Sequence, residues 1–312
     1  MNTDLFDKPN SAVNYLYMIG YQSITEFVEF VQSMDIRGKT LSDKDLLVNW
    51  RAAKLHLRSL AKTECELANF HSLDDLPSGW TDVSKYLAAE EDGASAFSRR
   101  WAVVELDRLT VFQKYVDLET VAAVESYLPT ELLPEDIASI ALGESLPSPS
   151  VTVSRPGGTT FQFNSPSRDV RCLELRELDP ATVLPRAYHR GRPISVIGIV
   201  IGAGAPVLSA VYCRRRIALL NGTHRGIALR KRGVTHVPCL IYLLNDEDEL
   251  GMLGRPELSR DAGLYFSSRR PPLFKDYFAS DLCQPMLVGK ANRSFSVNIS
   301  FERHKIPLSV NK

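Results

Sequence analysis

Apolar and polar residues repeat along this chain with two different periods, and the N-terminal third shows mainly the helical one. Ser23 and Glu26 have the spacing of a capping box, in which each residue bonds the other's backbone at a helix start. Apolar residues recur after them at helical spacing, at Phe27, Phe30 and Val31. A second repeat of this kind runs through residues 46–61. We therefore expect residues 11 to about 70 to be mainly helical.

The second helical repeat also carries cations on faces other than its apolar one. These are Arg51, Lys54, Arg58 and Lys62. Packing of the apolar face on a core, with the cations in solvent, is the simpler interpretation. The alternative is a basic interaction surface for nucleic acid or an acidic protein partner.

Strand-like segments dominate the middle of the chain. Residues 101–106 have the β-branched content of a strand, whereas 118–142 are helical in pattern and interrupted at Pro129 and Pro134. The apolar run over residues 194–211 predicts two strands of a buried sheet joined by a glycine-rich turn. It is too short for a membrane hairpin.

One segment after residue 215 combines several signals in order. A strand-like run, a tight turn, a short helical stretch, a glycine and a second strand follow one another at 216–220, 221–225, 226–232, Gly233 and 237–242. We expect a strand, turn, helix and strand unit here.

The turn of this unit has the chemistry of an anion site. Gly222 lets a backbone approach a phosphate closely, while Arg225 offers a permanently charged donor and His224 a group that titrates near neutrality. Thr223 adds a hydroxyl and Asn221 stabilises the turn, at a helix start that favours negative charge. The alternative is structural: Asn-Gly is a common turn, Arg225 would pair with an acid, and His224 would satisfy a buried carbonyl.

Composition limits the partners without choosing one. The 312 residues carry 37 Lys and Arg against 37 Asp and Glu, so the net charge is zero and any polyanion site must be local. No apolar run reaches the length of a membrane span, and the first residues lack a signal-peptide pattern, which predicts a cytoplasmic protein. The five cysteines and six histidines show no metal-ligand spacing.

The run from Leu220 to Leu229, closed by Gly233 and Val237-Pro238, resembles the signature segment of the ParB/sulfiredoxin-like superfamily. Members read Gly-x-x-Arg followed by an alanine-containing helix, a glycine and a proline-led strand. Residues 101–109 are similar to the superfamily's first strand, so the resemblance covers about residues 99–245. It implies a mixed-sheet α/β domain (an α+β fold) with an N-terminal helical region.

The resemblance implies that the loop from Gly222 to Arg225 holds the phosphates of a nucleotide. We expect ATP, ADP or CTP there, with Asn221 as a further binding residue and Mg²⁺ as the companion ion. Known members include CTP-hydrolysing chromosome-partition proteins, ATP-dependent sulfinic acid reductases and ADP-dependent serine kinases. Thr223 stands where the reductases have cysteine, which argues against their sulfur chemistry. An acidic run at 246–249 follows where partition proteins carry a DNA-binding domain, which argues against chromosome partition.

Further candidates surround this loop. Glu105 and Asp107 would share one face of an extended strand whose end the resemblance places near the loop, so they are candidate catalytic carboxylates together with His224. Alternating acids on a strand are otherwise a solvated face. Arg269 and Arg270, before a proline-stiffened aromatic segment, are candidate phosphate contacts; the alternative is a packing segment with solvated arginines.

These observations predict three regions and one function. The regions are a helical region at 1–98, the nucleotide-binding domain at 99–245 and a C-terminal extension at 246–312 that packs on it, with residues 147–150 forming a loop inside the domain. The predicted function is a nucleotide-dependent phosphotransferase or hydrolase acting on an unknown acceptor. The alternative is a non-catalytic nucleotide sensor or nucleic-acid-binding regulator. A phosphodiesterase ranks last because no metal constellation is present.

Overall fold

The computed structural model describes residues 11–37, 42–70, 72–74, 97–143, 150–165, 170–183, 193–202, 207–253, 255–290, 293–300 and 302. The chain divides into two units. Unit 1 comprises residues 1–146 and 205–290, and unit 2 comprises residues 147–204 and 291–312. The expected boundaries after residues 98 and 245 both fall within unit 1, and residues 147–150 begin unit 2 rather than a loop inside one domain. Most of 71–98 lies outside the described residues.

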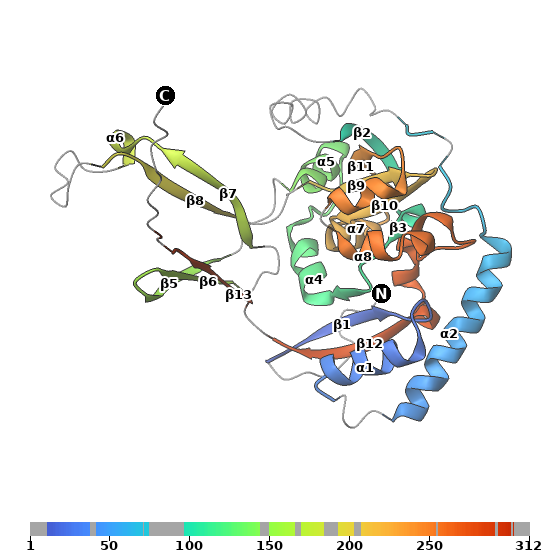
Figure 1. The fold of residues 1–312 in the computed structure, drawn as a ribbon. Helices are drawn as coiled ribbons and strands as arrows, with labels where there is room; N and C mark the ends of the chain where they lie inside the picture. The colour runs from blue at the N-terminus through green and yellow to red at the C-terminus, as the bar shows by residue number, and fades with distance from the viewer. Residues whose placement is uncertain are drawn as a thin grey trace, which may run out of the picture. The chain divides into compact units, whose positions relative to one another are not determined.

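A five-stranded mixed sheet forms the centre of unit 1 (Figure 1). Its strands, in spatial order, are β2 (Ser98–Glu105), β11 (His236–Leu243), β9 (Ser209–Cys213), β10 (Arg216–Asn221) and β3 (Thr110–Val111). β11 pairs parallel with β9, and β10 pairs parallel with β3, while the other two pairings are antiparallel. The mixed α/β class expected from the sequence is therefore confirmed.

Three helices contribute to the core beside this sheet. They are α4 (Leu118–Tyr127), α5 (Pro134–Leu142) and α7 (Thr223–Lys231). Ile227 and Leu229 of α7 are fully buried in the same cluster as Val121 of α4 and Ile140 of α5. The helical pattern over 118–142, broken before Pro134, and the strand, turn, helix and strand unit after residue 215 are confirmed.

A second sheet in unit 1 has the order β12 (Cys283–Gly289), β1 (Ala12–Met18) and β4 (Tyr115–Asp117), all antiparallel. Helices α1 (Ile24–Met34) and α2 (Asp43–Thr63) share a core with it. The capping box at the start of α1 is confirmed, with both hydrogen bonds present. The expected helix was wrong for β1, because this central strand is buried at every position and so shows no polar alternation.

Short helical segments complete unit 1 between β11 and β12. They are the 3₁₀ segment Glu247–Leu253, α8 (Pro256–Arg260), the π-helical Gly263–Ser267, and the 3₁₀ segments Phe274–Phe278 and Ser280–Leu282. Tyr265 and Phe266 pack with Leu250 and Leu258 in a further core cluster. The expected C-terminal extension is therefore divided, because these segments and β12 belong to unit 1 and the residues after 290 to unit 2.

The described strands of unit 2 form two small antiparallel sheets. One has the order β13 (Arg293–Asn298), β6 (Thr160–Ser165) and β5 (Thr152–Gly157), and the other pairs β7 (Arg171–Leu178) with β8 (Val196–Gly202); α6 (Pro180–Val183) follows β7. The run at 194–211 does contain two strands. They do not share a sheet as expected, since β8 belongs to unit 2 and β9 to unit 1, and no residue of β8 is fully buried.

No helix within the described ranges combines the length and the apolar character that crossing a membrane requires.

Candidate functional site

The turn between β10 and α7 is built on a left-handed glycine. Gly222 has φ +100° and is the N-cap of α7. A Cβ at this position would lie 2.9 Å from Leu208 Cγ, so backbone conformation and packing both require glycine. The Asn221 side chain donates to the Val207 carbonyl at 3.0 Å, so it ties the start of the turn to a distant segment and not, as expected, to its own backbone. The glycine is thus explained by the fold before any ligand is considered.

His224 is oriented by the backbone of another helix start. The amide of Asp117 donates to His224 Nε2 at 3.2 Å. Because that ring nitrogen accepts, the imidazole is neutral and carries its proton on Nδ1 in this geometry. The Asp117 carboxylate caps α4 by accepting from the amides of Glu119 and Thr120 at 2.9 and 3.2 Å. His224 is part-exposed, as a ligand-facing group would be.

Helices α4 and α7 lie side by side and run in the same direction. Their N-terminal ends meet through Asp117 and His224, and at their C-terminal ends Lys231 Nζ pairs with Glu125 at 2.7 Å. Beyond that pair, Arg232 donates to the carbonyls of Pro129 and Thr130 at 2.9 and 2.6 Å. Each helix N-terminus carries roughly half a positive charge. Two such ends therefore act on the same small region, and the Asp117 carboxylate offsets part of that charge.

Arg225 does not face an open cavity. It is buried, and its Nη1 donates to the carbonyls of Ile140 and Ala141 at 3.1 Å each. These carbonyls lie at the C-terminal end of α5, where a cation is favourable. The prediction that Arg225 grips phosphate is wrong for this geometry, because α5 already occupies the guanidinium. Thr223 is buried too, with 6% of the residue exposed.

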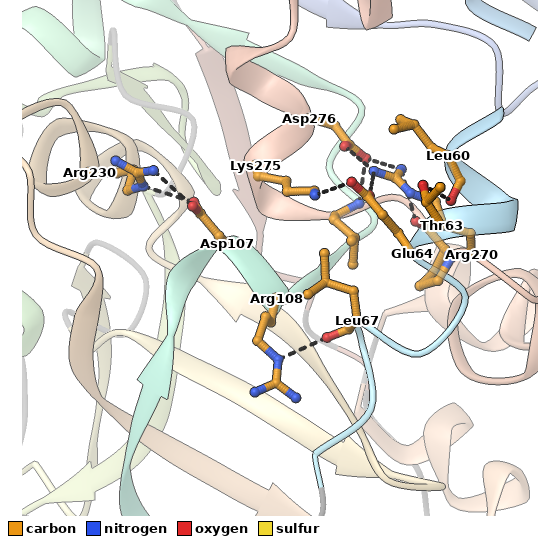
Figure 2. Close-up of polar contacts among 12 residues, drawn as sticks. Leu60, Thr63, Glu64, Leu67, Asp107, Arg108, Arg230, Arg270, Lys275 and Asp276 are labelled. Carbon is orange, nitrogen blue, oxygen red and sulfur yellow. Dashed lines mark hydrogen bonds and ion pairs between the residues drawn. The ribbon is translucent and has the colours of Figure 1, made fainter. Parts of the chain in front are cut away.

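The two candidate carboxylates lie at the other end of α7. Strand β2 ends at Glu105, and residues Leu106–Arg108 form a 3₁₀ turn, so Glu105 and Asp107 do not share a strand face. Asp107 accepts two hydrogen bonds from Arg230 at 2.9 and 2.8 Å (Figure 2). The Glu105 carboxylate pairs with Arg108, with 3.5 Å between Glu105 Oε2 and Arg108 Nη1.

The two carboxylates are therefore far from His224. Asp107 is held by Arg230, and Arg230 follows Thr223, the first residue of α7, by seven residues, which is about 10 Å along the helix axis. The reason is topological: β11 is antiparallel to β2, so the end of β2 pairs with the start of β11, directly after the C-terminus of α7. The expectation that Glu105 and Asp107 act beside His224 is therefore wrong. Asp117, which the sequence reasoning missed, is the acidic residue whose backbone amide contacts His224; an aspartate directly before a helical run was its signal.

Arg270 belongs to a buried ion network instead of a phosphate site (Figure 2). Its guanidinium binds both carboxylate oxygens of Asp276 at 2.6 Å and Glu64 at 3.1 Å, and it also contacts the Tyr21 hydroxyl. Lys275 donates to Glu64 at 2.6 Å. Burial raises the pKa of Glu64, but the hydrogen bonds from Lys275 and Arg270 outweigh it and leave that pKa lowered.

This network ties the C-terminal part of unit 1 to its N-terminal part, because Tyr21 follows β1 and Glu64 ends α2. With its side chain 1% exposed, Arg270 cannot bind phosphate without breaking the network. Arg269 is exposed and makes no hydrogen bond or ion pair with the described residues. We expected both arginines to contact phosphate. The ion network rules this out for Arg270, whereas for Arg269 it stays a prediction.

Within the described part of the chain, no group of three or more His, Cys, Asp or Glu side chains is placed to hold a metal ion. Mg²⁺ commonly binds through one or two carboxylates together with substrate phosphates and water. Such a bound Mg²⁺ does not need a dedicated protein cage.

Comparisons with protein-family models, with curated proteins and with solved structures found no match to this chain.

Proposed function

We propose that this protein binds the phosphates of a nucleotide at the joined N-terminal ends of α4 and α7. The observation that carries the proposal is the contact between the Asp117 amide and His224 Nε2, which brings two helix N-termini together. A phosphate group above this point would meet the positive ends of two helix dipoles.

Features of the turn support an anion at this position. Gly222 has no side chain with which to cap α7, and the helix carries no acidic residue in its first turn. Parallel helices with adjacent N-termini repel one another electrostatically, and an anion between them relieves that repulsion. The order of glycine-containing turn, helix, glycine and strand is also the one that the resemblance to the ParB/sulfiredoxin-like superfamily implies. The amides and His224 would then replace the buried Arg225 as the phosphate contacts.

The same resemblance motivates the choice of a nucleotide with Mg²⁺, and of phosphoryl transfer or hydrolysis as the reaction. Asp117 would serve this reaction in place of Glu105 and Asp107. One of its oxygens accepts the α4 amides. Its second oxygen would contact Mg²⁺ or orient the attacking hydroxyl, since phosphoryl transfer depends mainly on positioning and charge neutralisation. The acceptor would be water or a small hydroxyl compound.

Binding is tested by calorimetry of the full chain with ATP, ADP, CTP and GTP, each with and without Mg²⁺. His224→Glu places a carboxylate in the first turn of α7, where it favours the helix but repels phosphate. We expect it to weaken nucleotide binding by about tenfold or more while leaving the thermal midpoint unchanged or raised. His236→Glu, at the exposed first residue of β11, is the matched control and should bind like the wild type. Equal nucleotide affinity in the two variants would show that the nucleotide does not bind at the start of α7.

Turnover is tested separately by product analysis with Asp117→Asn. Asparagine caps a helix about as well as aspartate, so α4 should remain stable. We expect nucleotide affinity to be kept and turnover to fall by about tenfold or more. Nucleotide binding by the wild type without any product would support the sensor alternative. Unchanged turnover in Asp117→Asn would exclude the carboxylate from the reaction.

A second candidate function comes from the exposed face of α2. Four exposed cations lie along one line of this helix at spacings of seven, seven and four residues: Lys44, Arg51, Arg58 and Lys62. None of the four is ion-paired within the described structure. Two aliphatic residues lie between them on the same line, Val48 at 56% and Leu55 at 63% exposure. Lys54 is excluded from this line because it donates to the Gly20 carbonyl.

This α2 stripe spans about 27 Å, and its alternation of cations and aliphatic residues at spacings of four and three fits an acidic amphipathic helix of a protein partner. Fluorescence anisotropy with a 21-residue peptide of Glu and Leu heptads tests it. The double variant Arg51→Glu/Arg58→Glu should abolish binding, whereas Arg155→Glu/Arg176→Glu in unit 2 should not. Tighter binding of a 20-base-pair DNA duplex would identify the partner as nucleic acid instead.

A further inference from the structure

Strand β8 of unit 2 has an unusual edge. It pairs with β7 on one side, and no other described strand pairs with its second side. None of its seven residues is fully buried, and Ile197 is 75% exposed. Leu175 of β7, directly opposite Ile199, is 65% exposed on the same face. The sheet therefore presents both unpaired backbone groups and aliphatic surface.

The two edges of this sheet differ in the way that edge strands are usually protected. β7 contains two arginines and two glutamates, whereas β8, Val-Ile-Gly-Ile-Val-Ile-Gly, contains no charge and no proline. Charged residues and prolines on an edge prevent it from pairing with other strands. A two-stranded sheet is also marginal by itself, and three or more strands with an apolar face are needed for independent stability. Both facts indicate that β8 pairs with another strand.

The sequence of β8 indicates which strand. Consider two β8 strands paired antiparallel with Ile199 of one opposite Ile199 of the other. Each residue that precedes Ile199 in one strand then lies opposite the residue that follows Ile199 by the same number of positions in the other. Isoleucine then meets isoleucine on one face, through Ile197 with Ile201 and Ile199 with itself. On the other face every valine meets a glycine, because Val196 opposes Gly202 and Val200 opposes Gly198. Large side chains never oppose one another on the second face, so the strand is complementary to itself along its whole length.

We propose that the protein forms a symmetric dimer through antiparallel pairing of β8 with β8 of a second copy. The two-fold axis passes through Ile199, and the result is a four-stranded sheet with the charged β7 strands at its outer edges. Such an interface is isologous, so one strand supplies both halves of it. The isoleucine rows of the two copies, extended by Leu175, become one continuous apolar face.

The test is the oligomeric state of the full chain by sedimentation velocity. We expect a dimer for the wild type. Ile199→Lys places two lysines opposite each other on the axis, and Ile199→Glu places two glutamates there, so each variant should weaken dimerisation by about tenfold or more. Mixing the two variants should restore the dimer, because Lys and Glu then oppose each other. Restoration also shows that both variants are folded. Val183→Lys, outside the sheet and 46% exposed, is the control and should remain dimeric.

Three results would overturn the proposal. One is a wild-type monomer at about 100 μM, a concentration well above the Kd of a moderate interface. Another is a dimer that persists in both single variants, which would place the interface elsewhere. The third is failure of the Lys and Glu variants to combine while each remains folded by circular dichroism, which would exclude Ile199 from the axis.

Discussion

Replacement of Arg225 by alanine should destabilise the protein without acting through a ligand. The guanidinium makes two hydrogen bonds to the α5 carbonyls, and the side chain is only 7% exposed. A hydrogen bond to a charged group is worth about 1.5–3 kcal/mol, and the full penalty of unsatisfied carbonyls does not apply here. The Ile140 and Ala141 carbonyls each keep one other donor, the amides of Gly143 and Leu208. We therefore expect a loss of about 2–4 kcal/mol.

The assay is urea unfolding of the apo protein, followed by far-ultraviolet circular dichroism. Arg225→Lys keeps the charge but replaces the planar guanidinium with a compact ammonium, so it should lose about half as much stability as Arg225→Ala. Arg269→Ala is the matched control, since this exposed arginine should change stability by less than about 0.5 kcal/mol. A stable Arg225→Ala variant that fails only in nucleotide binding would refute the structural role argued here and return Arg225 to the phosphate site.

Two further predictions concern the core and the ion network. Gly226→Ala should destabilise by about 1–2 kcal/mol because the added Cβ would lie 2.9 Å from Phe274 Cζ, whereas Gly263→Ala, with nothing within 4 Å, should be tolerated; thermal melts of both variants compare them. Glu64 has a lowered pKa despite burial that raises it, because its cationic partners stabilise the carboxylate. Its contribution to stability is therefore present above its ordinary pKa of 4.5 and is lost as the pH falls below that value. Glu64→Gln should lower stability at neutral pH and flatten the acid side of a stability profile, and an unchanged profile would contradict the ion network.

Local signals in the sequence predicted local structure well. The capping box at Ser23 and Glu26 marks the start of α1 because both of its hydrogen bonds form within one turn. The unit around α7 was predicted for the same reason, since the left-handed Gly233, with φ +85°, follows the helix as a cap glycine should.

What could not be predicted depends on contacts distant in sequence. Arg225 meets carbonyls 84 and 85 residues earlier, and no pattern around Arg225 indicates that α5 ends there. Strand β1 was mistaken for helix because burial on both faces removes the alternation that identifies a strand. The acidic residue that contacts His224 through its backbone could not be chosen either, because the pairing of β2 with β11, set by the whole sheet, decides which acids lie near which end of α7.

The hydrogen bond from the Leu208 amide to the Ala141 carbonyl, 2.6 Å long, has a consequence for engineering. It joins the last turn of α5 to the residue before β9, so the chain leaves unit 1 and re-enters it at nearly one point. A short glycine linker from Gly143 to Val207 would therefore span the gap. A shortened protein that carries this linker and stops at Lys290 should retain both sheets of unit 1. Unit 1 can then be studied without unit 2.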